Sequence, residues 1–202
     1  THTNSMEKLT AVADALAEEN LVELVDPGII DPNILKQVHD PHYVDAFVNG
    51  IKPLASFQGF RNWNEQLRDA VLSVQAGQLE AAKIAWKEGI AANIAQGFHH
   101  AVYGGSYCTF NGLALLAQYF PDKKIFILDC DQHGGNGTAE FTLRLPNLFN
   151  FTIFGHRFGC ASYERSITRL IDQHTGTYEQ YVAAIEEGYQ TAVEWGADLI
   201  VY

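Results

Sequence analysis

The chain has 202 residues, of which 47% are hydrophobic and 18% are charged, and its formal net charge is -11. This composition is that of a globular protein and excludes a disordered or fibrous chain. The length suits one domain, so we expect residues 1–202 to form a single domain. The acidic balance provides no basic stripe, which argues against nucleic acid and anionic membrane surfaces as partners.

The cysteines are three in number and none lies close to another in the sequence: Cys108, Cys130 and Cys160. An odd number of unpaired thiols is typical of a reducing compartment, so we expect no disulfides and a cytoplasmic location. The first nine residues are too polar for a signal peptide. No apolar run approaches the roughly 20 residues that cross a bilayer, so we expect a soluble protein.

The first half of the chain is predicted to be helical. Apolar residues at helical spacing, or helix-capping residues, predict helices over residues 5–24, from 31, within 39–50 and over 64–95. Ser5 is a candidate N-cap for the first helix, and Gly50 is expected to end the third. Gly77 and Gly89 are expected to interrupt or bend the fourth.

The second half of the chain alternates helices with continuous apolar runs of strand length. Buried strands are expected at 124–129, 149–154 and 199–202, helices at 111–120, from 138 and at 177–195, and a loop at 97–105. Continuous apolar runs are typical of parallel strands that are covered on both faces. We therefore expect an α/β fold in which a doubly wound, mostly parallel sheet forms the middle of three layers.

The last apolar run ends the chain at Tyr202. In open α/β sheets, ligands bind just beyond the carboxyl ends of strands, which is where this chain stops. We therefore expect an excerpt of a longer protein, with a sheet that is incomplete at both ends. Uncovered sheet edges favour self-association, so a homo-oligomer is an expected state.

An acidic segment with one histidine follows the run at 124–129. Asp131 and His133 are two residues apart, so we expect their side chains to project to the same side of an extended backbone. Zinc accepts carboxylate oxygen and imidazole nitrogen, and a catalytic zinc site uses three protein ligands plus water. Taken alone, such a pair favours loop hydrogen bonds over two zinc ligands.

Asp129 is expected to face the same way as Asp131 and His133, and it needs a cation or a histidine beside it. The tandem histidines His99 and His100 are available as partners. Each can donate its Nδ1 proton to a carboxylate or amide and present Nε2 to a substrate or water, as an oriented general base does. The two motifs together form a candidate site, although the tandem pair alone is weak evidence.

Three glycines, Gly134, Gly135 and Gly137, let the chain turn sharply beside a metal or ligand. They equally fit a plain turn before a helix. A phosphate-binding loop is excluded, because no lysine follows in the required place.

Three sequence blocks resemble, in order and spacing, the signature blocks of the zinc-dependent histone deacetylase and acetylpolyamine amidohydrolase superfamily. They are GFHHA from Gly97, SYCTFN from Ser106 and ILDCDQHGGNGTAEF from Ile127. HDPHYVDAF from His39 is also similar, and the resemblance covers nearly the whole chain. It implies the arginase-deacetylase fold and zinc-dependent removal of acetyl groups from acetyl-lysine or acetylpolyamine substrates.

The resemblance also implies roles for single residues. Asp131 and His133 match two of the three zinc ligands of the family. His99 and His100 match its tandem active-site histidines. Asp129 matches the carboxylate that accepts a hydrogen bond from the first of these histidines.

Asn136 matches the partner of the second histidine, which is Asp in some family members and Asn in others. An amide carries no negative charge, so His100 is expected to be less basic than beside an Asp. By the resemblance, zinc would polarise the substrate carbonyl and its bound water, while His100 would be the general base and later the acid. His99 and Asp129 would supply electrostatic support.

The walls of the acyl tunnel are only partly defined by the resemblance. Tyr107 matches an aromatic wall residue, with Ser106 in place of the usual glycine before it, and His156 resembles a histidine after the next strand. The stretch RFGCASYERS departs from the family pattern. It leaves open whether Phe158 or Tyr163 forms the other wall.

Two parts of the family site are not found in the sequence: a third zinc ligand, an Asp expected soon after ADLIVY, and a tyrosine that hydrogen-bonds the oxyanion. We therefore expect the parent protein to be an amide hydrolase, and the 202-residue chain alone to hold zinc weakly and be inactive. One alternative is a non-catalytic binding domain that keeps the fold. Another is a di-manganese ureohydrolase, which would need an Asp where Gly135 stands.

Overall fold

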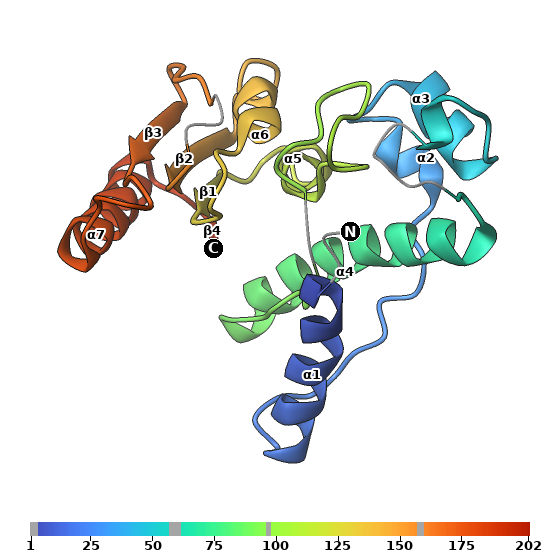
Figure 1. Cartoon of the computed structure of the whole chain (residues 1–202), viewed down its shortest axis with the longest axis horizontal. Helices are drawn as coiled ribbons and strands as arrows, with labels where there is room; N and C mark the ends of the chain where they lie inside the picture. The colour runs from blue at the N-terminus through green and yellow to red at the C-terminus, as the bar shows by residue number, and fades with distance from the viewer. Residues whose placement is uncertain (1–3, 57–61, 96–97, 157–159) are drawn as a thin grey trace.

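The structure is a computed structural model, and it describes residues 4–56, 62–95, 98–156 and 160–202 (Figure 1). The helices are α1 (Asn4–Glu18), α2 (Pro32–Leu35), α3 (Pro41–Val48), the 3-10 helix η1 (Leu54–Ser56), α4 (Glu65–Glu88), α5 (Gly112–Tyr119), α6 (Asn136–Phe141) and α7 (Tyr178–Trp195). The strands are β1 (Ile125–Asp129), β2 (Leu148–Phe154), β3 (Ser166–Leu170) and β4 (Leu199–Val201). In these described parts, no helix combines the length and the apolar character needed to cross a membrane.

The four strands form one sheet in the order β3-β2-β1-β4, and every neighbouring pair is parallel. In Figure 1, α7 lies on one side of the sheet, while α5 and α6 lie on the other. The predicted α/β fold with a parallel sheet between helical layers is confirmed. In the register of β1 with β2, Asp129 is the last residue of β1 and stands beside Thr152, while β2 continues for two more residues to Phe154.

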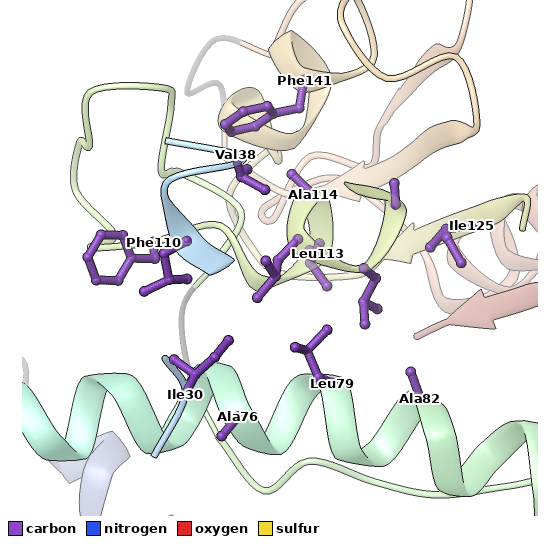
Figure 2. Packing of buried hydrophobic residues seen from close by; sticks show 14 of the residues in the cluster. Ile30, Val38, Ala76, Leu79, Ala82, Phe110, Leu113, Ala114, Ile125 and Phe141 are labelled. Carbon is purple, nitrogen blue, oxygen red and sulfur yellow. The ribbon is translucent and has the colours of Figure 1, made fainter. Parts of the chain in front are cut away.

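The two faces of β1 pack against two different hydrophobic clusters. Phe126 and Leu128 belong to a buried cluster that includes Ala184 and Ala192 of α7. Ile125 and Ile127 belong to the larger cluster on the other face. Figure 2 shows part of this cluster between α4 and α5, with Leu79 of α4 turned toward Leu113 of α5. Because side chains alternate along a strand, Asp129 continues the set that faces α5.

Helix termini follow the capping residues in the sequence. The side chains of Asp31 and Asp40 accept backbone N–H groups at the starts of α2 and α3, and proline follows each of them. The predicted stop of α3 is confirmed, since it ends at Val48 and Gly50 has a positive φ of 69°. The first helix is shorter than expected, because α1 ends at Glu18.

The long helix α4 begins after the N-cap Asn64 and ends at Gly89, which adopts the left-handed conformation with φ 93°. The expected interruption at Gly77 is wrong, because the helix runs through it. A Cβ at Gly77 would lie 2.6 Å from Oδ1 of Asn93, so the absence of a side chain makes room for the segment that returns along the helix.

Two strands differ from expectation. The strand at 199–202 was expected to be buried, but β4 is the edge strand beside β1, and Ile200 is 37% exposed. The strand β3 was not predicted, because Ser166, Thr168 and Arg169 interrupt its apolar pattern. Both strands lie at the edges of the sheet, where one side of the strand needs no apolar cover.

Candidate active site

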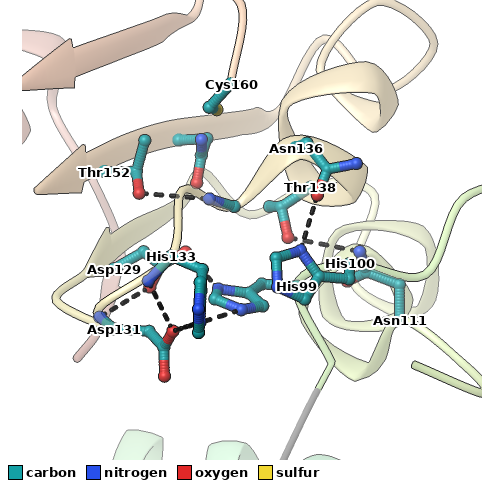
Figure 3. A network of polar contacts seen from close by, with 12 residues as sticks. His99, His100, Asn111, Asp129, Asp131, His133, Asn136, Thr138, Thr152 and Cys160 are labelled. Carbon is teal, nitrogen blue, oxygen red and sulfur yellow. Dashed lines mark hydrogen bonds and ion pairs between the residues drawn. The ribbon is translucent and has the colours of Figure 1, made fainter. Parts of the chain in front are cut away.

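The candidate site lies at the carboxyl edge of β1, where the loop that carries the tandem histidines meets the start of α6 (Figure 3). Nδ1 of His99 lies 2.7 Å from Oδ2 of Asp129, and both side chains are buried. The carboxylate is acceptor-only when ionised, so His99 donates through Nδ1 and presents Nε2 to the site. The hydrogen bond that the resemblance implied is therefore present.

The second histidine has its own partner. Nδ1 of His100 donates to Oδ1 of Asn136, at 2.6 Å, and Asn136 is the first residue of α6. The turn before this helix is anchored to β2, because the backbone N–H of Gly135 donates to Oγ1 of Thr152, at 3.2 Å. The His100 imidazole is thereby oriented from the start of a helix, and its Nε2 is left as the acceptor.

Asp131 and His133 also lie together, but not on an extended strand as expected. The chain bends at residues 131–133, and the backbone N–H of His133 donates to Oδ1 of Asp131, at 2.8 Å. The same Oδ1 lies 3.2 Å from Nδ1 of His133 and 3.7 Å from Nε2 of His99. The pair is half exposed, with side-chain exposures of 53% and 46%, so it lines the surface of the site.

The donor atoms of this pair fit a shared zinc ion. Two ligands at the usual bond lengths of about 2.0–2.1 Å and at a tetrahedral angle lie about 3.3 Å apart, and Oδ1 of Asp131 lies 3.2 Å from Nδ1 of His133. Within residues 4–56, 62–95, 98–156 and 160–202, no group of three or more His, Cys, Asp or Glu side chains has the geometry of a complete metal site. The described residues thus offer two donor atoms that fit one zinc ion.

The tandem histidines have opposite pKa shifts. Burial lowers the pKa of His99, but the hydrogen bond and charge of Asp129, together with the charge of Asp131, outweigh it and raise the pKa above its ordinary value. Burial and the charge of the neighbouring His99 lower the pKa of His100, against the raising effect of the Asn136 hydrogen bond. A neutral His100 beside a more basic His99 is the result.

Glycines at the start of α6 allow a close approach. A Cβ at Gly135 would lie 2.3 Å from Oδ2 of Asp129, and one at Gly137 would lie 2.5 Å from the backbone oxygen of Ala101. An aspartate at position 135 would therefore collide with the Asp129 carboxylate that holds His99. Position 137 lets α6 lie directly against the backbone that follows His100.

Aromatic residues surround the histidines. Tyr107 is exposed, and its ring meets that of His100 edge-on at a centroid distance of 5.8 Å. The ring of His156 lies 5.7 Å from that of His133. Tyr163 forms an antiparallel backbone bridge with Ser166. Phe158, the other candidate wall residue, lies outside the described residues, as does Gly97 of the first motif.

Sequence reasoning assigned no role to four buried polar residues behind the site: His39, Asn111, Thr138 and Thr152. Asn111 lies in a motif that carried the resemblance, and its side chain caps α5 by accepting the N–H of Ala114, at 2.9 Å. A capping residue before an apolar helix could have identified this one role. The contacts of the other three residues join distant segments and have no local sequence pattern.

All three cysteines are free thiols. Burial raises the pKa of Cys108 to about 11. Burial, with a smaller effect from the charge of Asp129, raises that of Cys160 to about 12, and burial likewise raises the pKa of Cys130. None of these groups is a thiolate near neutral pH.

Comparison with known proteins identifies the family of the chain. The family model of the histone deacetylase domain matches residues 2–174. An uncharacterized protein of Picosynechococcus sp. is 30% identical over 162 residues, which are 75% of this chain and 54% of the relative. Histone deacetylase 2 of Arabidopsis thaliana is 26% identical over 213 residues, which are 95% of this chain and 53% of the relative. The chain thus spans about half the length of these curated relatives.

Solved structures have the same fold. A crystal structure of acetylpolyamine aminohydrolase from Burkholderia pseudomallei superposes with a TM-score of 0.73 at 16% sequence identity, covering 95% of this chain and 71% of that one. At this identity the likeness bears on the fold. Because the family model matches most of the chain, and because the fold agrees, the chain belongs to the histone deacetylase domain family.

Proposed function

We propose that this chain carries the histidine side of the active site of a zinc-dependent deacetylase that removes acetyl groups from acetylated amines. The observation that carries the proposal is the pair of parallel hydrogen bonds, His99 to Asp129 and His100 to Asn136, beside Asp131. Both imidazoles are oriented through Nδ1, and Nε2 of His99 lies 3.7 Å from Oδ1 of Asp131. This arrangement suits proton transfer at an amide.

Zinc would be held by Oδ1 of Asp131 and Nδ1 of His133, whose separation of 3.2 Å suits two ligands of one ion. When bound, such an ion polarises an amide carbonyl and lowers the pKa of a water molecule. The neighbouring Nε2 of His99 lies 3.7 Å from Asp131, so the histidines stand beside this position.

His100 is the proposed general base. Its lowered pKa keeps Nε2 unprotonated near neutral pH, so it can take a proton from water and later deliver it to the leaving amine. His99 has a raised pKa and is paired with Asp129, so it is the proposed electrostatic support for negative charge that develops on the carbonyl oxygen. Tyr107, exposed beside His100, is the proposed wall of the acyl tunnel.

The substrate class is proposed from relatives whose names state deacetylation. One is the histone deacetylase of Arabidopsis thaliana, and another is acetylpolyamine amidohydrolase 2 of Pseudomonas aeruginosa, which is 49% identical over 47 residues, 21% of this chain and 14% of that relative. Acetyl-lysine peptides and acetylpolyamines share an acetylated primary amine. A di-manganese ureohydrolase is not favoured, because Gly135 stands where it needs an additional aspartate, and a side chain there would collide with the Asp129 carboxylate.

We further propose that the 202-residue chain alone binds zinc weakly and does not turn over substrate. Support comes from the two ligands that Asp131 and His133 supply, where a catalytic zinc site uses three. The remaining ligand and an oxyanion donor would be supplied from outside this chain.

The proposed function is tested with the zinc-loaded full-length protein and a panel of acetyl-lysine peptides and acetylpolyamines, by measuring release of acetate. Hydrolysis of at least one class is expected, and His100→Ala should reduce kcat by about a hundredfold or more, within the 10²–10⁴-fold typical of a general base. A protein that binds these ligands but releases no acetate would contradict the proposal. It would favour the alternative of a non-catalytic binding domain.

A further inference from the structure

His39 is a fully buried histidine that the proposed reaction does not use. Its Nε2 lies 2.9 Å from the backbone nitrogen of Asn111, which can only donate, so Nε2 is the unprotonated acceptor. The proton therefore resides on Nδ1, which lies 3.0 Å from the backbone oxygen of Val102 and 3.1 Å from that of Tyr103. One neutral ring thus satisfies backbone groups at both ends of the loop 102–111.

Asn111, the partner of His39, extends this connection to the tandem histidines. Its Nδ2 donates to the backbone oxygen of Ala101, at 3.0 Å, and to Oγ1 of Thr138, at 3.2 Å. Figure 3 shows Asn111 and Thr138 side by side behind His100. Ala101 directly follows His100, so the amide of Asn111 holds the backbone at the base of that histidine.

Helix α6 is tied to the same segment. The backbone N–H of Thr138 donates to the oxygen of His99, at 3.1 Å. Because Gly137 has no side chain, α6 can lie directly against the backbone of Ala101. Since α6 begins with Asn136, which orients His100, the histidine and its partner are held relative to one another through this network.

The surroundings of His39 keep its ring in one position and one protonation state. The ring packs against Phe110, at a centroid distance of 5.3 Å, and edge-on against Phe141 of α6, at 5.6 Å. Burial in this apolar setting lowers its pKa to about 4, although the two backbone hydrogen bonds raise it. The ring therefore stays neutral, and the acceptor at Nε2 is maintained near neutral pH.

We propose that His39 is a positioning residue for the tandem histidines, acting through Asn111 to hold the backbone that carries His100 against α6. This inference rests on the proposed function of that site. His39 lies in a different segment from every residue of the site itself. Its effect on the reaction is through geometry, since displacement of a catalytic group by about 1 Å can cost about a hundredfold in rate.

The test compares three variants of the zinc-loaded full-length protein. His39→Phe keeps a ring of similar shape among Phe110 and Phe141 but removes both hydrogen-bonding nitrogens. His39→Gln restores an acceptor for the Asn111 N–H. Phe149→Leu is the control for a general loss of stability, because Phe149 is buried on the α7 face of the sheet, stacked on Phe126.

Measured where all variants are folded, His39→Phe should lower kcat by about tenfold to a hundredfold with KM changed by less than about twofold, as for a misplaced catalytic group. His39→Gln should recover part of kcat, and Phe149→Leu should keep it. If His39→Phe and Phe149→Leu lower kcat equally at equal loss of thermal stability, the positioning role is overturned. Should His39→Phe fail to fold, the same comparison is made between His39→Gln and Phe149→Leu, with a partial loss of kcat expected only in His39→Gln.

Hydrogen exchange separates this inference from the proposed function. In His39→Phe, the amides of Asn111 and Thr138 should exchange at least about tenfold faster, while the amides of β2 keep their protection. Unchanged exchange at both amides would overturn the inference even in an active enzyme. A wild-type protein without deacetylase activity would refute the proposed function, whereas the exchange result would still decide whether His39 holds this segment.

Discussion

Nδ1 of His100 and Oδ1 of Asn136 lie 2.6 Å apart, which joins the loop after α4 to the first residue of α6. This contact sets the orientation of the imidazole and places its proton on Nδ1. In the full-length enzyme, Asn136→Ala should reduce kcat by about 10–100-fold, the usual effect of losing such an orienting partner. Asn136→Asp keeps the acceptor and should retain more of the activity. Steady-state kinetics with an acetyl-lysine peptide measure both, and an unchanged kcat in Asn136→Ala would refute the role.

The close approach of α6 to the tandem-histidine segment predicts a strong effect of one methyl group. Gly137→Ala would bring Cβ to 2.5 Å from the oxygen of Ala101, a backbone atom that cannot rotate away. We expect a loss of about 1–3 kcal/mol in the free energy of unfolding, as for other overpacked positions. Gly104→Ala is the matched control, because a Cβ there meets nothing within 4 Å. Thermal unfolding of both variants checks this, and equal melting temperatures would contradict it.

The buried neutral His39 predicts a loss of stability in acid. Burial lowers its pKa to about 4 in the folded protein, against 6.5 for an exposed histidine. Between these values the unfolded chain takes up a proton that the folded chain does not, so the stabilisation is complete above pH 6.5 and is lost as pH falls toward 4. The expected loss is roughly 2 kcal/mol by pH 5.

Urea unfolding at pH 7.5 and pH 5 measures this contribution. In His39→Phe the titrating ring is absent, so the difference in unfolding free energy between wild type and variant should narrow at pH 5. A difference that is the same at both pH values would show that His39 does not keep a lowered pKa.

The two proposed zinc ligands predict weak metal binding by the 202-residue chain alone. Asp131 and His133 supply two donors where catalytic zinc uses three, so zinc should be lost from the purified chain on dialysis. Metal analysis after dialysis gives the stoichiometry, and Asp131→Ala should lower the remaining affinity further. Tight one-to-one zinc that survives dialysis, and that Asp131→Ala does not weaken, would contradict this ligand assignment.

Much of the fold could be predicted from residue patterns. The continuous apolar run at 124–129 predicted β1. It is apolar because the strand lies between two helical layers, where all five residues of IFILD are buried. The strand β3 could not be found in this way, since an edge strand tolerates polar residues on both sides. Gly77 was misjudged because its neighbour Asn93 lies 16 residues further along the chain, and only the folded structure reveals the close approach.

The contacts of the candidate site between residues that are neighbours in sequence could be predicted, whereas most of the contacts between distant segments could not. Asp131 and His133 are neighbours in sequence, so their proximity follows from local geometry. The pairs His99 with Asp129 and His100 with Asn136 are separated by 30 and 36 residues. The chemistry of the residues indicated that Asp129 needs a histidine, but only the resemblance to a family told which histidine pairs with which partner. The contact of His39 with Asn111 spans 72 residues without a motif, so it became visible only in three dimensions.

The alternation of side chains along β1 links the chemistry of the site to the pairing of the sheet. Asp129 shares a face with Ile125 and Ile127, so it points to the layer that contains His99. A slip of β1 by one residue would turn this carboxylate into the apolar layer under α7, where Phe126 and Leu128 now lie. An inserted or deleted residue within the strand would thus hardly change the amino-acid composition, yet it would remove Asp129 from the site. The register of β1 in the sheet is therefore a requirement for the site.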